Sequence, residues 1–151
     1  MTEYRDLTFF TYSDSKWVFA SGFPYIMLSV GWLGSTVPVA DPLKPDAKKS
    51  LLYNLSLFIQ HPVNLCRGIH ICEICGCEPR LDSDKSWLGS GEIFIHGPNN
   101  LLYAAPTMIY HYVQEHDYVP PIDFIKSACH PPSMATYSQF AEAEAAYYKR
   151  G

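Results

Sequence analysis

Four of the five cysteines and one of the six histidines are concentrated in residues 66–77, which read C-R-G-I-H-I-C-E-I-C-G-C. Within this stretch Cys72 and Cys75 have the C-x-x-C spacing, which lets one tight turn direct two thiolates at a single metal ion. Gly76 follows directly, and a residue without a Cβ adopts the positive φ of such a turn at little cost. The residue types and their spacing therefore predict a metal-binding knuckle, with zinc as the metal.

A structural zinc site takes four protein ligands, so one C-x-x-C pair supplies only half of a site. The sequence contains no second pair of this kind. Side chains that could complete the site lie both inside the knuckle and further along the chain: His70, Cys66, Cys77, His111, His116, Cys129 and His130.

Two other interpretations of the cysteines remain open. Reduced cysteines in a protein core behave as small hydrophobic residues and need no metal. A redox-active C-x-x-C pair is the other alternative, but such a pair opens a helix after a strand in thioredoxin-like units. Gly76 and Pro79 argue against a helix that starts here.

The elements predicted after residue 72 are the knuckle, a hairpin and a helix, an order that resembles a treble-clef zinc fold. In that arrangement the helix supplies the remaining ligands, and His111 is suitably placed five residues after Pro106. His116 lies about 140° further round an ideal helix, so we expect only one of the two histidines to bind the metal. We therefore predict one structural zinc, bound by the set His70, Cys72, Cys75 and His111.

Each helical histidine also has an interpretation without a metal. His111 could be a core histidine whose ring is hydrogen-bonded to the backbone. His116 could stabilise the helix C-terminus through the helix dipole, which is the interpretation we favour for it.

The composition predicts one folded domain of 151 residues, since 48% of the residues are hydrophobic and 17% are charged. The net charge of −4 argues against a general nucleic-acid surface, which needs a basic face. The N-terminal residues M-T-E-Y-R-D-L lack the pattern of a signal peptide, and the apolar run 23–33 is too short and interrupted to span a membrane. We expect a cytoplasmic protein with thiols or a metal rather than disulfides.

The single domain 1–151 divides into three predicted parts. Residues 1–65 should contain strands at 7–12 and 16–20, an apolar segment at 23–34 that could be a strand or a buried helix, and a helix that Asp46 caps and that ends before Pro62. Residues 66–130 should contain the knuckle, a hairpin over 91–104, a helix from Pro106 to Asp117 and a short helix over 122–129. Residues 131–151 should form a peripheral helix. The predicted fold class is α+β, with a small antiparallel sheet.

From residue 31 onward the chain resembles a family of small bacterial proteins of unknown function. The segments that carry the resemblance are G-W-L-G at 31–34, R-G-I-H-I-C-E-I-C at 67–75 and the segment 102–124, which contains H-Y-V-Q-E-H-D-Y-V-P-P. The family pattern R-G-x-H-x-C-x-x-C, followed by H-Y-x-x-x-H-x-Y-x-P-P, points to His70, Cys72, Cys75, His111 and His116. The resemblance implies no activity, and it extends loosely to accessory proteins of bacterial toxin systems.

We expect binding to a protein rather than catalysis, with an immunity protein that masks a toxin as the specific hypothesis. Acidity suits capture of a basic partner, and no nucleophile elbow, P-loop or H-E-x-x-H motif is present. The alternative is a metal-dependent hydrolase or nuclease-like enzyme built on the hairpin and helix. It would use His96 with Glu92, or His96 with Asn99 or Asn100 and His111 on the metal.

Overall fold

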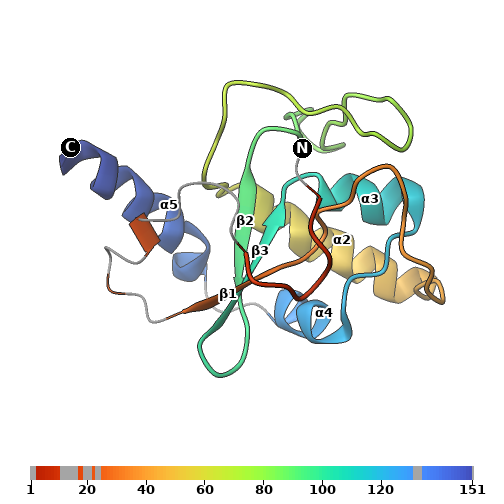
Figure 1. Cartoon of the computed structure of the whole chain (residues 1–151), viewed down its shortest axis with the longest axis horizontal. Coiled ribbons are helices and arrows are strands. Elements are labelled where there is room, and N and C mark those ends of the chain that lie inside the picture. The colour runs from red at the N-terminus through yellow and green to blue at the C-terminus, as the bar shows by residue number, and fades with distance from the viewer. Residues whose placement is uncertain (1–2, 11–16, 19–21, 23–24, 131–133, 151) are drawn as a thin grey trace.

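The computed structural model describes residues 3–10, 17–18, 22, 25–130 and 134–150, and it has an α+β fold. Its central element is a three-stranded sheet with helices on both faces (Figure 1). The strands are β1 (Ile26–Ser29), β2 (Glu92–His96) and β3 (Leu101–Pro106), in the order β1-β3-β2. None of the described helices combines the length and the apolar character that crossing a bilayer requires. The combination of this sheet with the helices confirms the predicted α+β fold class.

The sheet is mixed. Strands β2 and β3 form the predicted antiparallel hairpin, in which Phe94 pairs with Ala104. Its turn contains Asn99 and Asn100 at φ values of 54° and 61°, a region that asparagine enters more readily than most residues. Strand β1 pairs with β3 in parallel, which differs from the antiparallel sheet that we predicted. Parallel pairing needs a long crossover, and here the chain between β1 and β3 runs through α2, the knuckle and β2.

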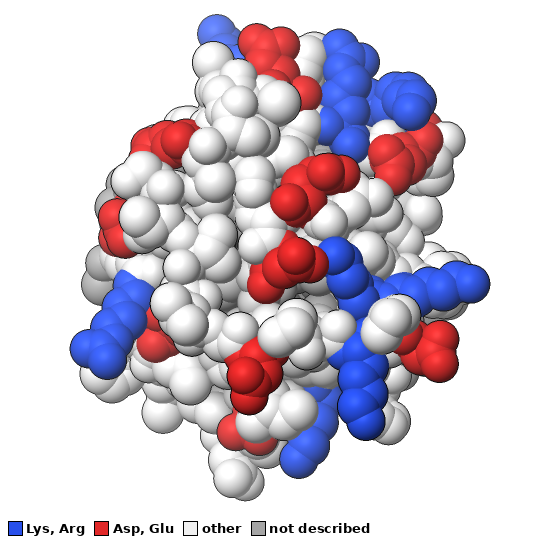
Figure 2. Space-filling model, turned by 90° about the vertical axis from the view of Figure 1, so that its right-hand side faces the viewer, with Lys and Arg blue, Asp and Glu red and all other residues white. Residues whose placement is uncertain are grey.

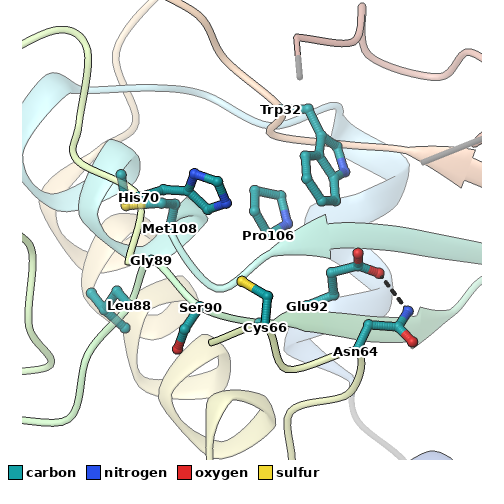
Figure 3. Close-up of a pocket in the computed structure, with 11 residues that line it drawn as sticks. Trp32, Asn64, Cys66, His70, Leu88, Gly89, Ser90, Glu92, Pro106 and Met108 are labelled. Carbon is teal, nitrogen blue, oxygen red and sulfur yellow. Dashed lines mark hydrogen bonds between the residues drawn. The ribbon is translucent and has the colours of Figure 1, made fainter. Parts of the chain in front are cut away.

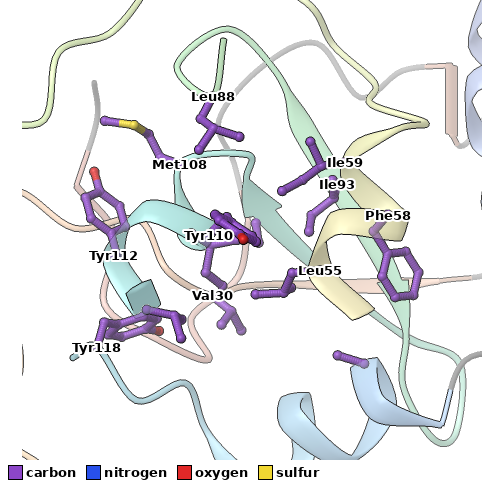
Figure 4. Close-up of a cluster of buried hydrophobic side chains, with 14 of the residues drawn as sticks. Val30, Leu55, Phe58, Ile59, Leu88, Ile93, Met108, Tyr110, Tyr112 and Tyr118 are labelled. Atoms are coloured by element: carbon purple, nitrogen blue, oxygen red, sulfur yellow. The ribbon is translucent and has the colours of Figure 1, made fainter. Parts of the chain in front are cut away.

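Three helices cover one face of the sheet: α2 (Pro45–Ile59), α3 (Ile109–His116) and α4 (Ile122–Cys129). The core between them contains inward residues of the strands together with apolar residues of α2 and α3 (Figure 4). Helix α2 contributes the apolar side chains of Leu51, Leu55, Phe58 and Ile59, all of them buried.

The starts of two of these helices differ from the predictions. Helix α2 begins at Pro45 and has Lys44 as its N-cap, so Asp46 lies in the first turn instead of capping the helix. Helix α3 begins three residues after Pro106, because Pro106 is the last residue of β3. Its end at Asp117, which has a left-handed backbone, and the bounds of α4 agree with the predictions.

The opposite face of the sheet packs against α5 (Met134–Arg150), whose Phe140 is buried with Trp17, Phe94 and Leu102. Trp17 stacks on Phe94 with ring centroids 5.6 Å apart. Trp17 and Val18 have a helical backbone, so the strand predicted over 16–20 is wrong at these two positions. Of the strand predicted over 7–12, Phe9 forms a single bridge to Leu28, and residues 11–12 lie outside the described residues.

His96 lies on this second face between two aromatic rings. Its ring centroid is 5.0 Å from that of Phe140 and 5.1 Å from that of Tyr25. Its Nε2 is buried and, among the described residues, has no hydrogen-bond partner. Burial lowers the pKa of His96, because the charged imidazolium loses its hydration there.

The environment of His96 predicts an acid-sensitive contribution to stability. A lowered folded-state pKa gives stability that is present above the unfolded pKa of about 6.5 and is lost as the pH falls. We expect the free energy of unfolding of His96→Phe, measured by urea titration, to decrease less than that of the wild type between pH 7.5 and pH 5. The other ionisable residues are the same in both proteins, so the difference isolates His96, and parallel pH profiles would contradict this account.

Candidate metal centre

The knuckle closes on itself through its own backbone. The N–H of Cys72 donates to the carbonyl of Cys77 at 2.9 Å, and the N–H of Gly76 donates to the carbonyl of Cys72 at 2.7 Å. Gly76 has a φ of +73° with open space around a Cβ position, so the backbone angle rather than crowding favours glycine there. The predicted tight turn is confirmed, and it holds Cys72 and Cys75 in one short segment.

Helix α3 is fixed next to the knuckle by burial and by contacts at its end. Ile109, Tyr112 and Val113 are buried in the core. Past the helix C-terminus, Asp117 forms an ion pair with Lys48 of α2 at 2.8 Å. The orientation of the helix is therefore set by its packing, independently of any group at its two histidines.

The four side chains Cys72, Cys75, His111 and His116 form one group, which we call the Cys/His cluster. Their ligand atoms all lie within 4.8 Å of one another. The distance from Cys72 Sγ to His116 Nε2 is 3.4 Å, and that from Cys75 Sγ to His111 Nε2 is also 3.4 Å. The two Nε2 atoms are 3.2 Å apart.

These distances match the edges of a zinc tetrahedron. With Zn–S near 2.3 Å and Zn–N near 2.0–2.1 Å, tetrahedral angles place sulfur and nitrogen ligands about 3.6 Å apart and two nitrogens about 3.3 Å apart. Each of the three measured contacts differs from these values by about 0.2 Å or less. The remaining pairs of ligand atoms lie within 4.8 Å of one another, so a tetrahedral ion would draw together any pair that exceeds about 3.8 Å.

The structure brings together three of the four predicted ligands, Cys72, Cys75 and His111, and places His116 with them instead of His70. The expectation that only one helical histidine faces the knuckle came from the 140° separation on an ideal helix. Two long side chains can nevertheless bend toward a point between their Cβ directions. The two Nε2 atoms lie 3.2 Å apart, so the two side chains span the axial separation of about 7.5 Å between their backbone positions.

His70 lies outside the Cys/His cluster and lines a separate pocket. Its backbone N–H donates to the carbonyl of Gly89 at 2.9 Å, and a Cβ at position 89 would collide with the His70 backbone. This close approach explains the glycine, and His70 lines the pocket instead of joining the metal centre. The other candidate ligands also lie outside the cluster: Cys66, Cys77, Cys129 and His130.

The pKa shifts favour metal binding at His111 and Cys75 and oppose it at Cys72. Burial lowers the pKa of His111, which keeps its ring neutral and its nitrogen able to bind a metal. Burial raises the pKa of the Cys72 thiol. At Cys75 burial acts in the same direction, but hydrogen bonds from the Cys77 backbone and the neighbouring thiols outweigh it and lower the pKa. Cys75 is thus the thiol that ionises more readily.

The residues of the enzyme hypothesis lie in separate surroundings. His96 packs against Phe140 and Tyr25, and Asn99 and Asn100 are exposed in the hairpin turn. Glu92 and His96 do share one face of β2, but they lie at opposite ends of the strand. His96 and Glu92 are not members of the Cys/His cluster.

Comparison with known proteins gives one match. A family model described as a domain of unknown function (DUF7919) matches residues 2–129. The matched region includes the whole Cys/His cluster, and α5 lies beyond it. No curated protein and no solved structure matches the chain.

The geometry predicts which substitutions remove a bound metal. We expect His116→Ala and Cys72→Ser to lose the metal measured by mass spectrometry of the purified protein, because each removes one of four converging ligand atoms. His70→Ala is the matched control and should keep the metal content of the wild type. The reverse pattern, with metal lost in His70→Ala and kept in His116→Ala, would refute this ligand set.

Proposed function

The chain belongs to the DUF7919 family, a domain family of unknown function, and we propose that it is a zinc-binding domain whose metal has a structural role. The ligands are Cys72, Cys75, His111 and His116. The observation that supports this proposal is the convergence of their two Sγ and two Nε2 atoms within 4.8 Å.

The donor atoms support zinc over other common metals. Two thiolates and two imidazoles in a tetrahedral arrangement suit zinc, whereas magnesium and calcium take oxygen ligands. Four protein ligands leave no open position for water or substrate, which is typical of a structural rather than a catalytic site. A hydrolase needs an open coordination position for water, so one of these four residues would have to be absent from the metal.

The proposed metal would hold a long segment without regular secondary structure. Residues 60–91, which we call the connecting loop, join α2 to β2 and contain no helix or multi-residue strand. A zinc ion at the cluster would link this loop to α3. Metal binding of this kind contributes directly to folding, by about 10–16 kcal/mol in isolated zinc-finger peptides.

Binding to a protein is the role that we propose for the domain. The support is that the connecting loop exposes large apolar side chains, among them Leu65 at 64%, Ile69 at 41% and Ile71 at 53%. On the face that Figure 2 draws, acidic and basic side chains are interspersed. The exposed apolar side chains are therefore the main argument for a protein-binding surface. The net charge of −4 supports a basic partner, and a toxin that the domain neutralises is the specific case we propose.

A structural zinc predicts that metal removal destabilises the fold. We expect a strong chelator such as TPEN to lower the melting temperature of the purified protein by about 10 °C or more, because the connecting loop loses its link to α3. Amide hydrogen exchange should increase first in residues 66–77.

The matched control for this experiment is His116→Ala, whose melting temperature should already be low and should not respond to the chelator. Cys77→Ser, which changes an exposed thiol of the same knuckle outside the cluster, should respond as the wild type does. An unchanged melting temperature after the metal has been removed would disprove the structural role.

A further inference from the structure

The Cys/His cluster brings a buried thiol and an exposed thiol together. Cys72 is buried and Cys75 is exposed, and their Sγ atoms lie within 4.8 Å of each other. Both belong to the turn that the N–H of Gly76 closes onto the carbonyl of Cys72, not to a helix as in thioredoxin-like units. Residues three apart in such a turn lie within about 7 Å, the Cα separation that a disulfide can span. The turn as it stands therefore allows a disulfide between these two thiols.

The two other thiols of the knuckle lie outside the cluster. Cys77 is exposed, and its Sγ donates to the carbonyl of Cys75 at 3.8 Å. In Figure 3 the side chain of Cys66 is directed into the separate pocket, of about 270 Å³, that it lines together with Trp32 and His70. The knuckle thus contains one pair of thiols that share the cluster and two thiols that serve as internal comparisons.

A disulfide and a zinc ion would compete for the same two sulfur atoms. The thiolate is the form of cysteine that binds a metal, and a disulfide sulfur is no longer a thiolate. After oxidation, only the imidazoles of His111 and His116 would remain of the four ligands. Two ligands are half of what a structural zinc site takes, so the ion would be held weakly. The thiol pair can therefore bind the metal or form a disulfide, but it cannot do both.

We propose that the Cys/His cluster is a redox switch, an inference that rests on the zinc-binding function proposed above. The oxidant is a peroxide. The exposed Cys75 thiolate attacks one peroxide oxygen, the O–O bond breaks, and a sulfenic acid forms with release of hydroxide. The Cys72 thiolate then attacks the Cys75 sulfur, expels a second hydroxide and forms the disulfide. The two thiolates lose two electrons, the peroxide gains them, and the zinc ion leaves.

The disulfide would not replace the link that the metal makes. Both of its sulfur atoms belong to residues 66–77, whereas a zinc ion would join this segment to the two histidines of α3. Oxidation therefore frees the connecting loop from α3. The loop carries the exposed side chains of Ile69 and Ile71, so the proposed protein-binding surface loses its fixed position in the oxidised form.

The test treats the purified full chain with hydrogen peroxide after its metal content has been measured by mass spectrometry. A chromogenic zinc chelator reports released zinc, and the intact mass and peptide mapping report the disulfide. We expect one zinc released for each disulfide formed, a mass lower by two hydrogen atoms, and a cross-link that joins Cys72 to Cys75. Dithiothreitol with added zinc should restore the metal content.

Cys77→Ser and Cys66→Ser are the matched controls, because each removes an exposed thiol outside the cluster, and both should release zinc in the same ratio as the wild type. A cross-link that includes Cys77 or Cys66 in the wild type, or loss of zinc release in either variant, would overturn the assignment. Zinc that is present and stays bound under peroxide would overturn this inference alone. Absence of metal from the untreated protein would overturn the zinc proposal and this inference together.

Discussion

The connecting loop meets the packed helices where two thiols and two imidazoles converge between the knuckle and α3, and the path of the loop is constrained by this convergence. Loops as long as the connecting loop are uncommon inside compact domains unless they carry a function. Here the loop is held by scattered contacts, such as the bridge from Val63 to Glu92 and the backbone bond from Cys66 to Ser90. The Cys/His cluster is the place where four side chains from two separate segments meet.

The two faces of the sheet explain how one strand serves different purposes. Alternation along β2 directs Ile93 and Ile95 into the core under α2 and α4, and Glu92, Phe94 and His96 toward the other face. Phe94 packs between the two polar residues. Glu92 therefore reaches a pocket with hydrogen-bonding partners, whereas His96 enters an apolar aromatic environment. The same strand face carries a hydrogen-bonded carboxyl group at one end and a histidine packed against aromatic rings at the other.

Local signals predicted much of the fold and three of the four residues of the Cys/His cluster. The C-x-x-C-G turn, the G-P-N-N hairpin and the helix Ile122–Cys129 depend on nearby residues, and the structure contains all three. The errors concern long-range packing. Trp17 and Val18 have a strand-like composition but a helical backbone against the sheet, and β1 pairs in parallel with a strand far along the chain. His70 lies close to the C-x-x-C pair in the sequence, whereas His116 joins the cluster through the position of α3 beside the knuckle, which no local pattern records.

His70 and Cys72 are two residues apart, and they point into different sites. A short, tightly turned segment thus forms part of the wall of the pocket and part of the metal centre at once. A change in the backbone of this segment would therefore alter the pocket wall and the metal centre together, so the two places cannot vary independently in sequence.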